Sequence, residues 1–374
     1  MEEKDSEIIF RPYKSGDEEQ IVPLLEEVFK EWPDRDIPCT KVDFWKWKYL
    51  DSPYNVNTIS VAEIDDKIIG CYHAQHYYIN FHGESFFTRA GTDVATHPDY
   101  RGMGLFNKML EVHNLLEDGL KTRLNVAVHV NPILIERVKR KISEFNDRIF
   151  FNRIYEITYI NDINLHLNNT SKSDDLKKYI GFYTLKNISK ISNIMHSNTD
   201  LNKKLNIIHI NKFNDDVNDL LDSNNRHLVF NVVKDKAYLN WRYCDKRAGN
   251  YIVKAAYVDE QLLGYYVLKI NKLKEYHTGN IVDLLVHNEH PYLLDALVHD
   301  VLMEIHENDV NVVRQWVIRN SIMEKTFQQN GFIDTRSGVP VLVVRKIDQN
   351  INLEELFESP PDKIHFQMGD TEWM

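Results

Sequence analysis

The chain has 374 residues, of which 43% are hydrophobic and 27% charged, a composition typical of two or three globular domains. Its 45 Lys and Arg residues against 56 Asp and Glu residues leave a net charge of -11, which argues against a protein that mainly binds nucleic acid. The acidic first five residues, the absence of an apolar run of roughly 18–20 residues and three scattered cysteines predict a soluble, cytoplasmic protein without disulfides, nucleic-acid partner or membrane contact.

The first 160 residues alternate short strands with amphipathic helices, an order that predicts an α/β fold with helices on the faces of a mixed sheet. Apolar runs indicate the strands, and apolar side chains three or four residues apart indicate the helices. In chain order we expect a strand at 8–10, a helix with Ile21, Leu24, Leu25 and Val28 on one face, an aromatic cluster at 44–49, a hairpin at 59–71, a central strand at 91–96, a helix from 105 that ends near Gly119, and a strand at 124–130.

A second segment repeats this order, which indicates an internal duplication. Trp47 and Gly70 are 23 residues apart, as are Trp241 and Gly264. Asp93 matches Asp283, and Asn131 matches Asn320, with a few residues of drift. We therefore expect domains at 1–160 and 204–350, a connector with one helix at 161–203 and a tail at 351–374.

The loop after the central strand of the first half carries the strongest chemical signal. Gly102 and Gly104 let the backbone approach a ligand closely and adopt turn conformations closed to other residues. The amides of residues 103–106 follow at the start of a helix, where unpaired N–H groups and the helix dipole favour an anion. Arg101 adds a positive charge with a forked donor geometry. The loop therefore indicates a site for a pyrophosphate.

Residues 92–106 resemble motif A of the GNAT acetyltransferases, which bind acetyl-CoA. The family pattern is Gln/Arg-x-x-Gly-x-Gly/Ala; Asp99 occupies its first position, a departure, and the adjacent Arg101 supplies charge. The strand at 124–130, which leads into Asn131, resembles motif B. The resemblance implies acetyl-CoA as acyl donor, with the thioester and pantetheine held by the backbone of Val94 and Thr96 and by Asn131, and the pyrophosphate by Arg101, Gly102, Met103, Gly104, Leu105 and Phe106.

The duplication resembles tandem-GNAT proteins. In the second half, the loop at 287–292 has no glycine and places Glu289 where phosphate would lie. The late family pattern is kept at 327–332. We therefore expect two GNAT-like domains, of which the second kept the fold and lost the cofactor.

Acetyl transfer to an amine also needs a proton acceptor, because an amine with a pKa of about 10.4 is almost fully protonated at neutral pH. Asp93, on the central strand, is the first candidate, although a buried structural carboxylate is an equal alternative. Glu63 and His129 are weaker candidates, because lone ionisable residues on strands are more often solvent-facing or hydrogen-bonded. The family's general-acid Tyr is absent from the helix at 133–138. In the enhanced-intracellular-survival type of GNAT enzyme the terminal carboxylate is the base, which by resemblance suggests Met374.

No metal site is expected from the histidines. His73 and His76 are three residues apart in a predicted strand, so their side chains point to opposite faces. His287 and His290 have only Glu289 as a nearby ligand. The aromatic clusters around Trp47 and Trp241 are interpreted as core anchors, with stacking on an acceptor as the alternative.

The leading hypothesis is an acetyl-CoA-dependent N-acetyltransferase, active in the first half by direct attack of an amine on the thioester. The acceptor would be a small amine, an amino sugar or a protein amine. Two alternatives are a non-catalytic acyl-CoA sensor, because the acid Tyr is missing, and a Fem-type aminoacyl transferase, which the intact glycine loop and the negative charge disfavour. The sequence leaves the acceptor, the oligomeric state and the acyl-chain preference open.

Overall fold

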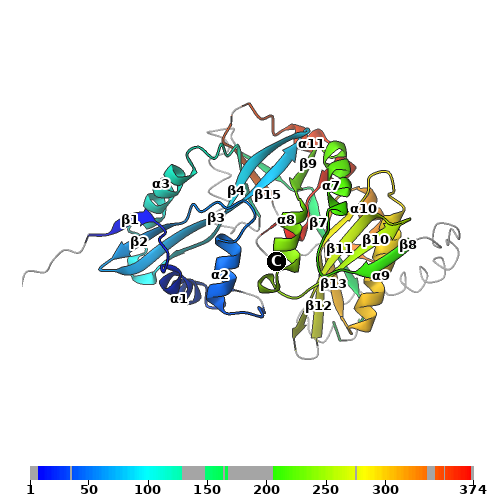
Figure 1. Ribbon diagram of the computed structural model, residues 1–374, viewed down its shortest axis with the longest axis horizontal. Helices are drawn as coiled ribbons and strands as arrows, with labels where there is room; N and C mark the ends of the chain where they lie inside the picture. Colours follow the sequence, from blue (N-terminus) through cyan, green and yellow to red (C-terminus); the bar gives the residue numbers. More distant parts are fainter. Residues whose placement is uncertain are drawn as a thin grey trace, which may run out of the picture.

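The chain forms two mixed sheets, which lie at the left and the right of Figure 1. This computed structural model describes residues 7–33, 36–128, 148–162, 165–166, 205–273, 276–334, 342–348 and 350–371. Among these residues, no helix has both the length and the apolar character needed to cross a membrane. The connector helix expected at 179–196 lies outside the described residues.

The first sheet has the strand order β1-β2-β3-β4-β5-β15-β6, and β9 and β16 extend it beside β3. Within the main order, only β4 and β5 run parallel. The strands are β1 (Ile9–Pro12), β2 (Ser60–Ile64), β3 (Lys67–Phe81), β4 (Glu84–Thr96), β5 (Leu124–Ala127), β6 (Arg148–Phe151), β9 (Phe230–Val233), β15 (Leu342–Lys346) and β16 (Ile364–His365).

The second sheet has the order β8-β10-β11-β12-β13-β7-β14, and only β12 and β13 run parallel. Its pattern of parallel and antiparallel neighbours is therefore the same as that of the first sheet. The strands are β7 (Ile154–Ile160), β8 (Leu205–His209), β10 (Tyr251–Val258), β11 (Gln261–Leu273), β12 (Tyr276–Val286), β13 (Val312–Ile318) and β14 (Ile333–Asp334).

Each half places one strand within the main strand order of the other half's sheet. β7 precedes the connector in the chain, yet it lies between β13 and β14 of the second sheet. β15 follows the second sheet in the chain, yet it lies between β5 and β6 of the first. The division expected at 1–160 and 204–350 therefore cuts across both sheets, because each sheet is completed by a strand from the other half.

Helices cover both faces of the first sheet, with α1 and α2 on one face and α3 on the other (Figure 1). Ile68 and Cys71 of β3 pack toward α1 and α2, whereas Ile69 and Tyr72 pack toward α3. The strict alternation of side chains is interrupted here, because the register between β2 and β3 shifts opposite Ile69. The helices are α1 (Glu18–Phe29), α2 (Lys41–Tyr49), α3 (Leu105–Glu117), α7 (Asp216–His227), α8 (Lys236–Leu239), α9 (Leu293–Glu307), α10 (Ile322–Gln329) and α11 (Glu355–Glu358).

Trp47 and Trp241 join the halves around a local two-fold relation. Their rings stack with centroids 5.2 Å apart and an interplanar angle of 25°. Trp47 Nε1 donates to the carbonyl of Trp241 at 2.9 Å, and Trp241 Nε1 donates to the carbonyl of Trp47 at 3.0 Å. This contact occupies both rings, which favours their interpretation as core anchors, although they connect the two halves rather than a helix and its own sheet.

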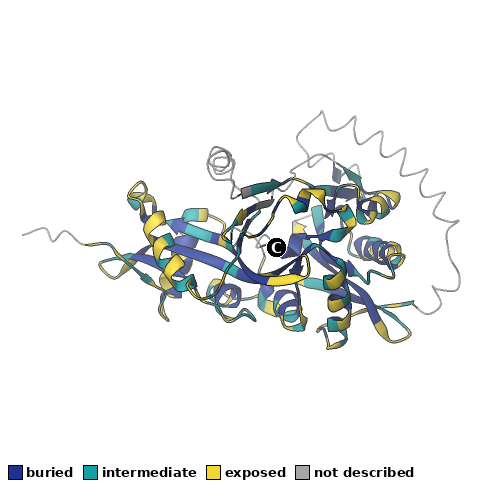
Figure 2. Cartoon of the chain, turned by 90° about the horizontal axis from the view of Figure 1, so that it is seen from above, coloured by how far each residue is buried: buried dark blue, intermediate teal, exposed yellow. Residues whose placement is uncertain are grey.

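The largest hydrophobic cluster is also shared between the halves. It contains Ile79 of β3 and Leu124 of β5 together with Val217 of α7 and Phe366 near the C-terminus. Figure 2 shows buried strands through the middle of both halves, with exposed residues on the outer helix faces and loops. The two sheets therefore fold around a common core.

Candidate active site

The loop between β4 and α3 begins with the turn η1 (Pro98–Tyr100) and ends at Gly104. Nδ1 of His97 accepts a hydrogen bond from the amide of Asp99 at 3.3 Å. Gly102 and Gly104 have φ angles of 83° and 79°, in the left-handed region that residues with a Cβ rarely adopt. A Cβ at either glycine would meet no atom within 4 Å. The backbone conformation therefore requires these glycines, and the space in front of them is open.

Five consecutive amides, those of residues 102–106, make no hydrogen bond within the described part of the chain. The first turn of α3 contains no acidic residue, and no side chain caps it. Arg101, next to these amides, is exposed. Unpaired amides at the positive end of a helix dipole, beside a guanidinium, form a site for an anion. The pyrophosphate site expected from the sequence stays a prediction, to which this geometry gives support.

The parallel strands β4 and β5 part beside this loop. Among the described residues they pair only at Thr88 with Leu124 and at Arg89 with Asn125, although β4 continues to Thr96. We call the region beside residues 90–96 the first opening. The amide of His97 donates to the carbonyl of Ile69 in β3 at 2.8 Å. Because alternate amides of a strand face the same neighbour, those of Val94 and Thr96 face the first opening instead.

Asp93 lies in a β-bulge at the edge of the first opening, with a φ angle of 43°. Its Oδ2 accepts hydrogen bonds from Lys48 Nζ at 2.7 Å and from the hydroxyl of Tyr49. Burial opposes ionisation, but the charge of Lys48 and these hydrogen bonds lower the pKa of Asp93 to about 2. A carboxylate of this pKa is a weak proton acceptor at neutral pH, so the contacts favour a structural role, and its role as a base stays a prediction.

His73 fixes the backbone of Asp93 through a hydrogen bond to its carbonyl. Trp45 Nε1 donates to His73 Nε2 at 3.0 Å, and His73 Nδ1 donates to the carbonyl of Asp93 at 3.0 Å. Burial lowers the pKa of His73 to about 4, so the ring is neutral. Lys48 and Tyr49 were not predicted as partners of Asp93, nor Trp45 as a partner of His73, because the aromatic cluster at 44–49 was interpreted as core anchors or as a stacking surface for an acceptor.

Glu63 does not belong to this site. It lies on β2, and β3 lies between β2 and β4. The backbones of β2 and β4 are therefore about 10 Å apart, which is two strand spacings. Its carboxylate accepts from Arg11 Nε at 2.9 Å. An ion pair at the outer edge of the sheet explains the residue better than catalysis. His129, Asn131 and Met374 lie outside the described residues, so their predicted roles remain predictions.

The corresponding loop of the second half has a different end. Nδ1 of His287 accepts from the amide of Glu289 at 3.2 Å, as His97 does from Asp99. After this shared turn α9 begins directly. The amide of Leu293 donates to the carbonyl of His290, and the amide of Leu294 donates to the carbonyl of Pro291. These bonds use the amides that stay unpaired in the first loop. The geometry therefore favours the expectation that the second half lacks the anion site.

The chain's own tail occupies the region where β12 and β13 part, which we call the second opening. These strands pair only from Thr278 to Asn280 of β12. His365 Nε2 donates to the carbonyl of Leu284 at 3.0 Å, and Gln367 accepts from Gln315. A cavity of about 140 Å³ remains beside the tail, lined in part by Val286 and His287. The second opening is therefore largely filled.

Comparison with known families identifies one domain. Residues 9–124 match the family model described as an acetyltransferase (GNAT) domain. This range runs from β1 to the start of β5 and includes the loop with Gly102 and Gly104. A comparison with curated proteins finds no match.

Solved structures with a similar fold cover both sheets. A GCN5-related N-acetyltransferase from Anabaena variabilis is 11% identical, with a TM-score of 0.58, and the match covers 91% of this chain and 73% of that one. A probable N-acyltransferase from Enterococcus faecalis gives the same values. Saccharomyces cerevisiae N-myristoyltransferase with bound myristoyl-CoA is 11% identical, with a TM-score of 0.54, over 90% of this chain and 79% of that one. At these identities the likeness concerns the fold.

Proposed function

Residues 9–124 form a GNAT acetyltransferase domain, which makes the chain an acyltransferase, and from this premise we propose that it transfers the acetyl group of acetyl-CoA to a primary amine. The observation that carries the proposal is the row of unpaired amides at 102–106, at the start of α3. Together with Arg101 they supply five N–H donors and one positive charge for the diphosphate of the coenzyme. The second half, in this proposal, keeps the fold without binding the donor.

The amides of Val94 and Thr96 would hold the thioester end of the donor in the first opening. Donors fixed in advance stabilise the negative charge that develops on the thioester oxygen during attack by the amine. Asp93 contributes to this arrangement by holding the bulge, because Lys48, Tyr49 and His73 fix its side chain and its carbonyl. In this proposal the strand geometry, rather than the Asp93 carboxylate, assists the reaction.

A primary amine must also lose a proton, and we propose the carboxylate of Met374 as the acceptor. The described tail ends at Thr371, whose carbonyl accepts from Arg242, the neighbour of Trp241 at the junction of the halves. The contacts that the structure describes between the tail and the second opening come from His365 and Gln367, which a chain ending at Thr371 keeps. We expect deletion of residues 372–374 to abolish turnover while acetyl-CoA still binds, as measured by thiol release and calorimetry. Unchanged turnover would rule out Met374.

The acceptor would be a small amine, an amino sugar or a protein amine. The net charge of -11 is compatible with a cationic acceptor, which an acidic protein attracts. A panel of amines with graded charge and size, tested by thiol release at fixed acetyl-CoA, would identify the class.

One pair of measurements tests the function against its alternatives. We expect acetyl-CoA to raise the melting temperature of the full chain, and an amine from the panel to release free coenzyme thiol. Stabilisation without thiol release for any amine would favour an acyl-CoA sensor. No stabilisation by acetyl-CoA would favour a donor other than a coenzyme A thioester, as in a Fem-type transferase.

A further inference from the structure

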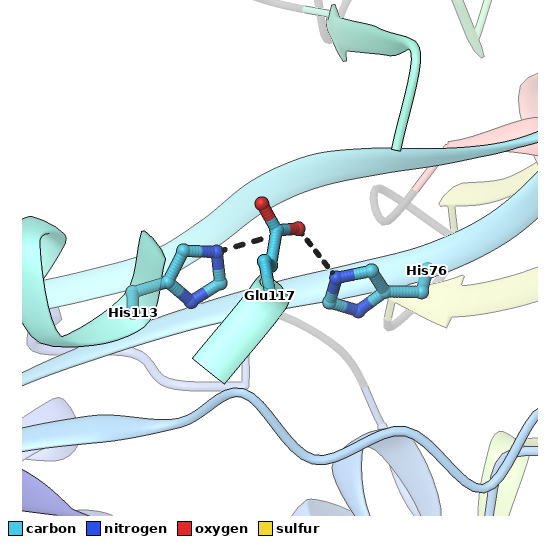
Figure 3. A group of neighbouring side chains, drawn as sticks. All are labelled: His76, His113 and Glu117. Atoms are coloured by element: carbon cyan, nitrogen blue, oxygen red, sulfur yellow. Dashed lines mark hydrogen bonds and ion pairs between the residues drawn. The ribbon is translucent and has the colours of Figure 1, made fainter. Parts of the chain in front are cut away.

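Two imidazoles and one carboxylate meet between the first sheet and α3, at a distance from the proposed active site (Figure 3). His76 comes from β3, and His113 and Glu117 come from α3. Nε2 of His76 lies 2.8 Å from Oε1 of Glu117, and Nε2 of His113 lies 3.6 Å from the same oxygen. The three atoms lie within 4.8 Å of one another, and all three side chains are buried.

The secondary structure brings these ligand atoms to one place. His113 and Glu117 are four residues apart, so they lie on the same face of α3 one turn apart. That face packs on β3, as the burial of Leu105 and Met109 shows. His76 projects toward it, whereas His73 projects toward α2, as expected from their spacing.

The Nε2 atom of His113 is the unusual member of the group. His113 is 0% exposed, and its Nδ1 donates to the carbonyl of Thr58 at 2.7 Å. When the ring is neutral, Nε2 therefore carries a lone pair, and this atom has no hydrogen-bond partner among the described residues. It faces Oε1 of Glu117, which is also an acceptor. Two lone pairs that face each other in a buried place leave a position for a cation.

The surroundings orient the carboxylate for such a ligand. Arg89 Nη1 donates to Oε2 of Glu117, and Arg89 Nε donates to Asn125 at 2.6 Å. This leaves Oε1 directed toward the two imidazoles. A hydrogen bond that fixes the far nitrogen of an imidazole, as Thr58 does for His113, is typical of the second shell of metal sites. The charge of Arg89 opposes a cation and would moderate its affinity.

We propose that His76, His113 and Glu117 bind one divalent transition-metal ion of the zinc class. Two imidazole nitrogens and a carboxylate oxygen are a ligand set that zinc accepts, with water in the fourth position. When the ion binds, the proton on Nε2 of His76 moves to Nδ1 of the same ring. The ring stays neutral, and its Nε2 is free to bind the ion. The ion fastens the end of α3 to β3, about 18 Å along the helix from the loop that holds the diphosphate. It therefore stabilises the donor-binding helix and takes no part in the transfer.

The proposal departs from the expectation that the chain has no metal site. That expectation paired His76 with His73 on the same strand, where a shared ion is excluded. The spacing of His113 and Glu117 on a helix was available in the sequence, but nothing in the sequence placed His76 opposite them.

The test is a titration of the full chain after removal of metal by chelation. We expect one equivalent of Zn²⁺ to bind with micromolar affinity or better, and a hundredfold excess over Kd to raise the melting temperature by roughly 3 °C. His113→Gln and Glu117→Gln should each abolish the binding of this Zn²⁺ ion. His287→Gln is the matched control, because it alters the partly exposed group of His287, Glu289 and His290 and should leave the binding of one Zn²⁺ per chain unchanged.

Failure of wild-type protein to bind Zn²⁺ would overturn the proposal, as would binding that persists in Glu117→Gln or disappears in His287→Gln. If the α3 variants do not fold, the wild-type protein still decides the matter by NMR. Zn²⁺ should shift the ring signals of two buried histidines in slow exchange, and a shift confined to exposed histidines would contradict the site. No coenzyme is present in these measurements, so their outcome is independent of acyl transfer.

Discussion

The first and the second opening share their strands and differ in the loop that follows. The loop before α3 spans residues 97–104, whereas the one before α9 spans 287–292 and is two residues shorter. Both loops begin with a histidine whose Nδ1 accepts a hydrogen bond from the backbone amide of the second residue after it. After this turn the two loops differ. Gly102 and Gly104 extend the first loop by two residues, and the amides at the start of α3 stay unpaired, whereas Pro291 and Tyr292 lead directly into α9. In the proposed function, anion binding would therefore depend on a short stretch of backbone and not on the fold as a whole.

The two openings also differ in what lies beside them. In the second, His365 bonds the carbonyl of Leu284, the residue that corresponds to Val94. The tail thus binds the strand edge that the proposed donor would bind in the first opening. In this proposal the same strand edge binds a ligand in one copy of the fold and a segment of the chain itself in the other.

Gly104→Val gives the largest expected effect on this comparison. A β-branched residue is strained at a φ angle of 79°, so the start of α3 should rearrange and acetyl-CoA affinity should fall on the order of a hundredfold. Tyr292→Val is the matched control, because Tyr292 holds the same position before α9. Calorimetric titration of both variants measures the difference. Equal losses would mean that the active half has been assigned wrongly.

Asp93→Asn tests the paired carboxylate at the edge of the first opening. The folded-state pKa of about 2 lies below the ordinary value of 3.8, so the ionised form stabilises the fold above about pH 4 and this contribution is lost as the pH falls toward 2. We expect Asp93→Asn to lower the free energy of unfolding by about 2 kcal/mol at pH 7, and the deficit to shrink between pH 4 and pH 2. Urea unfolding over this range measures it. A deficit independent of pH would exclude the ionised pair as its source.

Arg101→Ala should reduce acetyl-CoA affinity about tenfold, because an exposed charge-assisted hydrogen bond to phosphate is lost. The difference from wild type should narrow at high salt, which screens the same charge. Pro291→Ala, at the corresponding place in the second loop, should leave the affinity unchanged. A salt-independent loss in Arg101→Ala would point to a structural role for this side chain.

Trp47→Phe and Trp241→Phe should produce the smallest effects, and equal ones. Each keeps an aromatic ring and removes one of two reciprocal N–H donors, which should cost about 1 kcal/mol of unfolding free energy. Because the rings touch, the double variant should deviate from the sum. A markedly larger loss of unfolding free energy from one of them would show that the two reciprocal hydrogen bonds do not contribute equally to stability.

Local patterns in the sequence predicted the elements that depend on nearby residues. The glycine loop, the helix after it, the hairpins and the matched positions of Trp47 and Trp241 follow from spacing, turn residues and periodicity. The exchange of β7 and β15 could not be predicted this way, because a strand's periodicity shows which face is buried and not which strand lies beside it. The same limit explains why Lys48 and Tyr49 were missed as partners of Asp93.

The exchange of strands has a consequence for dissecting the protein. A fragment that ends within the connector would carry β7 without its neighbours and would lack β15, so that β5 and β6 would present bare backbone edges. Separate expression of the two pieces should yield aggregates, whereas co-expression should restore a nicked but complete molecule. Each piece therefore depends on a strand that the other piece carries.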